Sequence, residues 1–285
     1  MPARNAIAID LGTTALKVAA VSLRGEVLWS GSRALTTHTA TGGAATQDPH
    51  EWWALVRELV REAAAVGDIA AIATTGQWAS TVPVDADGEP VGSCVMWMDT
   101  RAASLAHAVI GGRVAGLNPR NALAWVRKTG GAPSTTGADF LGHVLLLQRD
   151  GSPARWFLEP VDFLTMRLTG TAAASHASMT AAWLTDNRRL DILDYDDDLL
   201  RRAGVDRTRL PPLRPSGTVI GTVRADVARD LGLPDGVQVI AGVPDLHSAS
   251  IGAGTVDDFA THLAISTTSW ISCPVPFKKT SVSTQ

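Results

Sequence analysis

The stretch from Ile7 to Thr14, Ile-Ala-Ile-Asp-Leu-Gly-Thr-Thr, decides how the rest of the sequence is interpreted. A short apolar strand delivers one carboxylate, Asp10, and a tight turn through Gly12 then presents the hydroxyls of Thr13 and Thr14. Backbone N–H groups and hydroxyls in such a turn can donate to phosphate oxygens, and the carboxylate can organise Mg²⁺ through water. The same residues also suit an ordinary β-hairpin, so the pattern alone leaves both interpretations open.

The composition is typical of a soluble globular protein. The chain has 285 residues, of which 45% are hydrophobic and 19% charged, and its net charge is −3. No basic stripe marks a nucleic-acid surface, and no apolar stretch approaches the ~20 residues of a membrane span. The two cysteines, Cys94 and Cys273, fit neither a disulfide framework nor a zinc pattern. We therefore expect a cytoplasmic protein of one or two domains, without nucleic-acid or membrane partners.

The hydrophobic pattern predicts a mixed sheet flanked by helices. Expected strands are 6–10, 17–23, 26–31, 69–75 and 237–241, and expected helices are 51–65, with Asp48 as its N-cap, and 153–169. Antiparallel strands come first, and strands alternating with helices follow, which favours an α/β fold. A last hairpin is expected between 261 and 272.

A second carboxylate, Asp245, follows the expected strand 237–241 and precedes a helix rich in small residues. A carboxylate at the carboxyl end of a strand is well placed to accept a proton from a substrate hydroxyl. Aspartate is also favoured as the N-cap of a helix, so that simpler role stays open.

Polar and aromatic residues follow two further strands. They are Gln77, Trp78, Trp97, Asp99 and Arg101. Tryptophan stacks on the C–H face of a sugar, whereas amide, carboxylate and guanidinium groups bind sugar hydroxyls, so these residues indicate a sugar site. The alternative places Trp97 in the core and makes Asp99 the cap of a helix from Thr100.

The segment from Ile265 to Trp270, Ile-Ser-Thr-Thr-Ser-Trp, repeats the logic of the first hairpin. Its hydroxyls, on Thr267 and Thr268, could hold a nucleotide from the opposite side. Serine and threonine are common in strands, so an ordinary hairpin remains the alternative. P-loop, Rossmann and Gly-x-Ser-x-Gly motifs are absent from the sequence, which disfavours those enzyme classes.

Taken in order, six segments resemble the FGGY carbohydrate kinases, and in particular their xylulokinase-like members. They are Ala8 to Thr14, Thr46 to Trp53, Thr75 to Gln77, Trp97 to Arg101, Pro160 to Gly170, and Gly242 to Asp245. The second resembles the family's Gln-Asp-Pro-x-x-Trp segment and the fifth its Pro-x-Asp-x-x-x-x-x-Leu-Thr-Gly helix. Each motif is short, but all six occur in the family's order, and the resemblance extends over nearly the whole chain.

The resemblance implies an RNase H-like fold of the actin/hexokinase type, with ATP and sugar in a cleft between two domains. It implies that Asp245 is the base, that Asp10 organises Mg²⁺, and that the turns at 12–14 and 267–268 hold phosphates. Residues 1–244 would form the sugar-binding domain, and 245–285 would begin a nucleotide-binding domain that we expect to be incomplete.

Two departures from the family pattern affect the expected function. Ser266 stands where the family's second hairpin usually has glycine, and Trp78 stands where xylulokinases usually have Met-His. We expect an ATP-dependent kinase for a ketopentose such as xylulose, or for a related sugar or polyol, acting as a homodimer. The alternative is a catalytically silent sugar-binding fragment of such a kinase. An actin-like or chaperone-type ATPase is disfavoured by the sugar-site segments.

Overall fold

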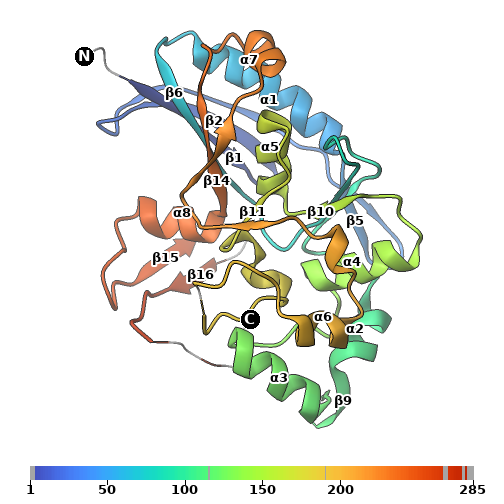
Figure 1. Cartoon of the computed structure of the whole chain (residues 1–285). Helices are drawn as coiled ribbons and strands as arrows, with labels where there is room; N and C mark the ends of the chain where they lie inside the picture. The colour runs from blue at the N-terminus through green and yellow to red at the C-terminus, as the bar shows by residue number, and fades with distance from the viewer. Residues whose placement is uncertain (1–3, 115, 190, 266–268, 278–279, 281–285) are drawn as a thin grey trace.

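The computed structural model describes residues 4–114, 116–189, 191–265, 269–277 and 280. Within this part of the chain, the main sheet has six strands in the order β13-β14-β6-β1-β2-β3 (Figure 1). Their bounds are β13 (Val219–Thr222), β14 (Gln238–Pro244), β6 (Ile69–Gly76), β1 (Asn5–Leu11), β2 (Ala15–Ser22) and β3 (Val27–Ala34). Strands β14, β6 and β1 are parallel, whereas β13, β2 and β3 are antiparallel to their neighbours. The mixed sheet predicted from the sequence is confirmed.

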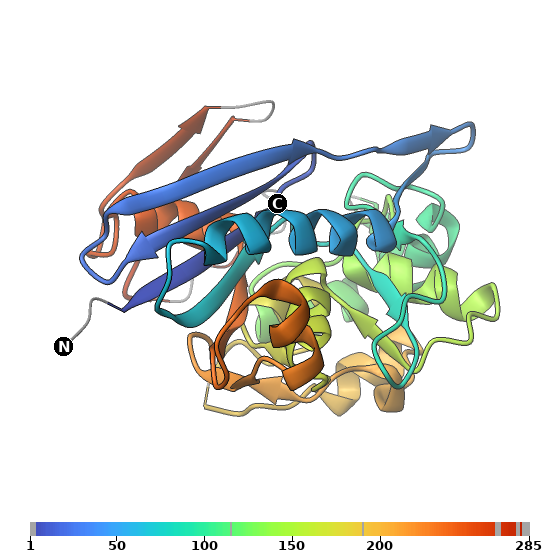
Figure 2. The same ribbon diagram turned by 90° about the horizontal axis from the view of Figure 1, so that it is seen from above.

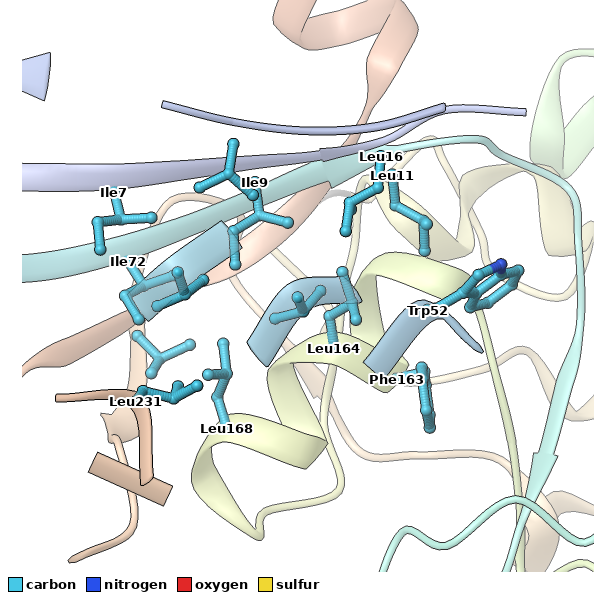
Figure 3. Packing of buried hydrophobic residues seen from close by; sticks show 14 of the residues in the cluster. Ile7, Ile9, Leu11, Leu16, Trp52, Ile72, Phe163, Leu164, Leu168 and Leu231 are labelled. Carbon is cyan, nitrogen blue, oxygen red and sulfur yellow. The ribbon is translucent and has the colours of Figure 1, made fainter. Parts of the chain in front are cut away.

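Three helices cover one face of this sheet, and α1 runs along strands β1 to β3 (Figure 2). They are α1 (Pro49–Ala64), α5 (Pro160–Thr169) and α7 (Ala225–Leu231). Alternate residues of the central strands, such as Ile7, Ile9 and Ile72, point toward the helix layer, where Figure 3 shows Leu168 and Leu231. Burial of each such side chain contributes roughly 1.5–3 kcal/mol, so this layer fixes which face of the sheet is core.

Helix α1 begins where the sequence predicts. The Asp48 carboxylate accepts a hydrogen bond of 2.8 Å from the N–H of His50, and Pro49 occupies the first helical turn, where its missing N–H costs nothing. Trp52, Val56 and Leu59 lie on its buried face at helical spacing.

A second hydrophobic cluster lies among the helices of the middle of the chain. These helices are α2 (Ala103–Ile110), α3 (Pro119–Thr129), α4 (Phe140–Arg149), α6 (Asp197–Ala203) and the short 3₁₀ helix η1 (Ser178–Ala182). Trp125, Phe140 and Phe157 are its largest fully buried side chains. The mainly helical middle segment was predicted from the sequence.

Shorter elements complete the described chain. They are β4 (His38–Ala40), β5 (Ala44–Gln47), β7 (Val82–Val84), β8 (Cys94–Val95), β9 (Gly111–Val114), β10 (Trp156–Leu158), β11 (Ala174–Ser175), η2 (Arg207–Arg209), β12 (Leu213–Arg214), α8 (Asp245–Gly252), β15 (His262–Ile265) and β16 (Ser269–Ser272). Strands β15 and β16 form the antiparallel hairpin that was predicted. Thr267 and Thr268 lie outside the described residues.

The helix predicted for 153–169 is wrong in its first half. Residues 156–158 form strand β10, which pairs antiparallel with β7, and α5 begins only at Pro160. Ser152-Pro153 resembles a helix start, but the N–H of Arg155 instead donates to the carbonyl of Val84 at 2.7 Å. Pairing with a distant strand outweighed the local signal.

Candidate functional site

The three central parallel strands end side by side. Leu11 of β1, Gly76 of β6 and Pro244 of β14 are neighbours in register. The N–H of Gln77 donates to the carbonyl of Leu11 at 2.8 Å, and a Cβ at Gly76 would lie 2.4 Å from that same oxygen, so only glycine fits there. The segments that follow these strands therefore meet at one edge, where α/β sheets bind ligands.

A row of polar side chains crosses this edge on the sheet face opposite the helices. Asp10 is in register with Thr75 on one side and with Lys17 on the other. The Lys17 ammonium group lies 3.0 Å from the Asp10 carboxylate. The Thr75 hydroxyl is buried and has no hydrogen-bond partner among the described residues. Thr75 was missed as a site residue, although its position just before Gly76 places it beside Asp10.

Asp245 is the first residue of α8 rather than its cap. The N-cap is Pro244, and the Asp245 carboxylate accepts one hydrogen bond of 2.7 Å, from the N–H of Leu246. Partial burial raises the pKa of Asp245, the negative charge of Asp10 adds to the rise, and Lys17 opposes it. The side chain remains open to solvent. A reachable carboxylate with a raised pKa suits the acceptance of a proton.

The turn at 12–14 is held by hydrogen bonds within the turn and to neighbouring segments. The N–H of Gly12 donates to the carbonyl of Ala15 at 3.1 Å, and the carbonyl of Thr14 accepts from Leu35 at 2.9 Å. The Thr13 hydroxyl accepts a hydrogen bond of 3.2 Å from the Trp97 indole. The expected phosphate turn and sugar segment are therefore in direct contact.

Gln77 is 2% exposed and lies within a buried hydrogen-bond network. Its amide donates to the side chain of Gln47 at 3.1 Å and accepts from the Ser80 hydroxyl at 3.4 Å. Gln47 in turn donates to the carbonyl of Thr13 at 2.7 Å and accepts from the Trp52 indole at 3.1 Å. The network fixes the shape of the edge from within. Gln47 opens the Gln-Asp-Pro-x-x-Trp segment, but it was not predicted as a site residue, because its role depends on partners from distant segments.

Trp78 lies beside the helix that carries Asp245. Its indole N–H donates to the carbonyl of Ser178 at 2.7 Å. Its ring packs edge-to-face against the His247 ring, with 5.8 Å between the ring centroids. Burial lowers the pKa of His247, so its ring is neutral at pH 7. His247 was also missed by the sequence reasoning.

Asp99 and Arg101 form a clamp at the rim of the same edge. The buried Asp99 carboxylate accepts hydrogen bonds from the N–H of Ala45 at 2.9 Å and from that of Arg101 at 3.0 Å, and its oxygen lies 2.7 Å from the guanidinium. Burial acts to raise the pKa of Asp99, but the hydrogen bonds and charge of Arg101, with the Ala45 N–H, outweigh it and lower the pKa. Helix α2 begins at Ala103, so Asp99 caps no helix from residue 100. Trp97 is 36% exposed and is not a core residue.

The side chains at this edge include oxygen donors that could bind the expected Mg²⁺. Among the described residues, no three His, Cys, Asp or Glu side chains lie close enough together to hold a metal ion by themselves. Mg²⁺ usually keeps several waters and binds through one or two carboxylates together with substrate phosphates. Asp10, which is partly exposed, and its neighbour Asp245 supply that donor set. The residues fit a magnesium–nucleotide complex better than a protein-only cage.

No helix in the described part of the chain combines the length and apolar character that a membrane span requires.

Comparison with known proteins gives a consistent result. The model of the FGGY family of carbohydrate kinases, N-terminal domain, matches residues 5–126 and 148–252. The chain is 31% identical over 261 residues to the xylulose kinase of Streptomyces rubiginosus, an alignment that covers 87% of this chain and 50% of that protein. The chain thus spans about half the length of the curated relatives it matches.

Solved structures share the fold. The ligand-bound xylulose kinase of Lactobacillus acidophilus superposes with a TM-score of 0.82 at 23% identity, over 94% of this chain and 54% of that one. The gluconate kinase of the same organism gives a TM-score of 0.81 at 22% identity, again over 94% and 54%. At this level of identity the likeness concerns the fold, which is the sugar-kinase fold expected from the sequence.

Proposed function

The chain belongs to the FGGY family of carbohydrate kinases, and from this premise we propose that it is the sugar-binding part of an ATP-dependent sugar kinase. The observation that carries the proposal is the meeting of Asp10, Thr75 and Asp245 at the carboxyl edge of three parallel strands. One side of the edge presents carboxylates, and the other presents Trp78 and the rim residue Arg101. Carboxylates beside an aromatic, hydrogen-bonding wall suit transfer of a phosphoryl group to a sugar hydroxyl.

Asp245 is the proposed general base. The raised pKa of its carboxylate brings its proton affinity closer to that of the group it must deprotonate, while its exposure leaves it accessible. It takes the proton from the sugar hydroxyl as that oxygen attacks the γ-phosphorus of ATP. The bond from phosphorus to the bridging oxygen breaks, and ADP leaves.

The phosphate side of the reaction falls to Asp10 and the 12–14 turn. Magnesium, when bound with ATP, neutralises charge on the phosphates. Asp10 would hold it through water, and the hydroxyls of Thr13 and Thr14 would orient phosphate oxygens. Thr267 and Thr268 are proposed for the same task from the second hairpin.

The proposed substrate is a ketopentose such as xylulose, or a related sugar or polyol. Its support is that the curated relatives at 31% and 26% identity are named xylulose kinases. A neighbouring fold named gluconate kinase shows that the fold alone does not select the sugar. Trp78 and His247 form the wall that we expect to select it.

The remaining parts of the proposal concern organisation. We propose residues 1–244 as the sugar-binding domain and 245–285 as the start of the nucleotide-binding domain. Both cysteines are free thiols, which suits a cytoplasmic location. A homodimer could bury the apolar side chains of Leu263, Ile265 and Ile271, which are 55%, 77% and 69% exposed. Light scattering during size-exclusion chromatography tests the dimer.

A coupled assay of ADP release across ketoses, polyols and gluconate tests the activity. We expect turnover only when a sugar is present, and highest with a ketopentose. Turnover without sugar would indicate an ATPase. Binding of sugar without turnover would indicate the silent sugar-binding module instead.

A further inference from the structure

Glu159 is a fully buried carboxyl group directly beneath the proposed sugar wall. It precedes Pro160 at the start of α5, in the middle of the molecule (Figure 1), and is 0% exposed. One of its oxygens accepts a hydrogen bond of 3.3 Å from the N–H of Ser80. The other finds no hydrogen-bond partner among the described residues. A buried, half-partnered carboxyl group is costly, so its position needs an explanation.

The segment that Glu159 contacts, residues 77–80, carries Trp78, one of the two side chains of the sugar wall. Its backbone is unusual, because Ala79 adopts a left-handed conformation with φ of 58°. The Ser80 hydroxyl accepts from the N–H of Trp97 at 2.9 Å and donates to Gln77. The Glu159 carboxyl therefore anchors the turn through which Trp78 is presented.

A second carboxyl group on the same helix holds the facing part of the wall. Asp162, one turn after Glu159, accepts from the Ser178 hydroxyl at 2.6 Å and from the N–H of Ser175 at 3.3 Å. The carbonyl of Ser178 is the acceptor for the Trp78 indole. Two segments that position Trp78, the turn 77–80 and the backbone at Ser178, are thus hydrogen-bonded to carboxyl groups at the start of α5. Helix α5 is itself packed into the core.

The charge state of Glu159 makes the glutamine variant informative. Burial raises the pKa of Glu159 well above its ordinary value, and the nearby charges of Asp162 and Asp245 raise it further, whereas the N–H groups of Ser80 and Ala79 oppose the rise. The rise favours the protonated form of the carboxyl group. A glutamine amide has nearly the same size as a protonated carboxyl group and keeps one acceptor oxygen.

We propose that Glu159 is a positioning residue for sugar binding: its carboxyl group fixes segment 77–80 from inside the fold and so sets the orientation of Trp78. This inference rests on the proposed function, because it assumes that the Trp78 wall binds the sugar. It makes Glu159 a determinant of sugar affinity without contact between Glu159 and the sugar.

The test compares Glu159→Gln, which keeps the acceptor, with Glu159→Met, which has the same length but no acceptor. D-Xylulose, D-ribulose and xylitol are titrated calorimetrically into the 285-residue chain, and thermal unfolding is followed in parallel. We expect Glu159→Gln to bind within about twofold of wild type. Glu159→Met should bind about tenfold more weakly, the loss expected when one backbone anchor is removed.

The matched control is Asp139→Leu, which replaces another buried carboxyl group with an apolar side chain of similar size and shape. Asp139 is the N-cap of α4 and accepts from the N–H groups of Gly142 and Ser134, both at 2.8 Å; neither bond involves Trp78 or His247. We expect it to lower the unfolding temperature and to leave sugar affinity unchanged. If Glu159→Met does not fold, Glu159→Asp replaces it, because it withdraws the carboxyl group by one methylene; the same tenfold loss is expected.

Wild-type affinity in Glu159→Met, or in Glu159→Asp where that replaces it, would overturn the proposal. An equal loss of affinity in Asp139→Leu would also overturn it, because the effect would then be one of stability. If the wild-type chain bound none of the sugars, the proposed function would fail instead. Hydrogen exchange of amides 79 and 80 would then decide the anchoring role separately: exchange must be faster in Glu159→Met than in wild type and Glu159→Gln, and equal rates in all three would refute it.

Discussion

Two aspartates that follow strands at the candidate site, Asp245 and Asp99, have opposite surroundings. Asp245 is reached by solvent, accepts one hydrogen bond from the neighbouring N–H, and has a raised pKa. Asp99 is fully buried, accepts from Ala45 and Arg101, and has a lowered pKa. The Asp245 carboxylate can therefore accept further hydrogen bonds, whereas both oxygens of Asp99 already have partners in the protein.

This difference distinguishes a carboxylate that can react with a ligand from one that holds the backbone in place. A general base must exchange a proton with a ligand, so it needs a free lone pair and a pKa shifted toward that of the reacting group. A carboxylate with several hydrogen bonds and an adjacent guanidinium is stabilised in its charged form and holds backbone in place. This contrast supports the proposal that Asp245 takes part in the chemistry, and it gives Asp99 the role of holding the backbone at the rim.

The largest effect that this comparison predicts is for Asp245→Asn. The amide cannot accept the hydroxyl proton, so kcat should fall by on the order of 10²–10⁴. Sugar affinity should change little, because the side chain keeps its size. Steady-state kinetics and calorimetry measure the two quantities separately. Normal turnover in the variant would remove Asp245 from the mechanism.

The next largest effect is expected for Asp99→Ala. The change leaves the N–H groups of Ala45 and Arg101 without their acceptor, at a cost of about 2 kcal/mol in the free energy of unfolding. Asp191→Ala is the control, since Asp191 pairs with Arg189 where the two side chains are 68% and 60% exposed. Its removal should leave the urea midpoint close to that of the wild type, because exposed ion pairs contribute little to stability. Equal urea midpoints for the two variants would contradict the positioning role.

The third prediction concerns pH and a carboxyl group inside the fold. Burial raises the pKa of Asp162 to about 8 from its ordinary 3.8, while hydrogen bonds from Ser178 and Ser175 oppose the rise. The folded state then binds the proton more tightly than the unfolded state. The associated stability is present at low pH and is lost as pH rises from about 4 to about 8, with a slope of at most about 1.4 kcal/mol per pH unit.

Asp162→Asn should flatten this part of the stability curve. Urea unfolding of both proteins at pH 5, 6, 7 and 8 measures the slopes. Glu159 contributes in the same direction because its pKa is also raised, so a smaller slope remains in the variant. A variant that keeps the full wild-type slope would show that Asp162 does not titrate in this range.

The smallest effect on stability is expected for Lys17→Met. Lys17 and Asp10 form an ion pair whose side chains are 61% and 34% exposed, so its loss should change the free energy of unfolding by less than about 1 kcal/mol. The positive charge of Lys17 also lowers the pKa of Asp245. Its removal should therefore move the acid limb of the rate profile to higher pH. A limb that moves to lower pH would contradict the proximity of these groups.

Much of the fold could be predicted from local patterns. The hairpin of β1 and β2, the cap at Asp48 and the strands around Ile72 and Val239 were confirmed, because each rests on period, turn chemistry or capping within a few residues. Segment 153–169 was misread, since the pairing of β10 with β7 joins residues far apart in the sequence.

The candidate site was predicted less completely than the fold. Residues that follow strand ends, such as Asp245 and Trp78, carry a positional signal, and the structure places them at one edge. Gln47 and Thr75 stand in segments that resemble the family, but their roles, like that of Glu159, depend on burial and on partners from distant segments. Glu159 in front of a proline reads as an ordinary exposed helix start, and only the fold shows that it is buried.

The central claim is that a sugar binds at the edge formed by the ends of β1, β6 and β14. Titration calorimetry of D-xylulose, D-ribulose and xylitol into the 285-residue chain and its Trp78→Ala and Asp245→Asn variants tests this claim most directly. The account predicts saturable binding of at least one of these sugars, near-normal affinity in Asp245→Asn, and a loss of about tenfold in Trp78→Ala, the size expected for one aromatic contact. Absence of binding in the wild-type chain, or binding that Trp78→Ala leaves unchanged, would contradict it.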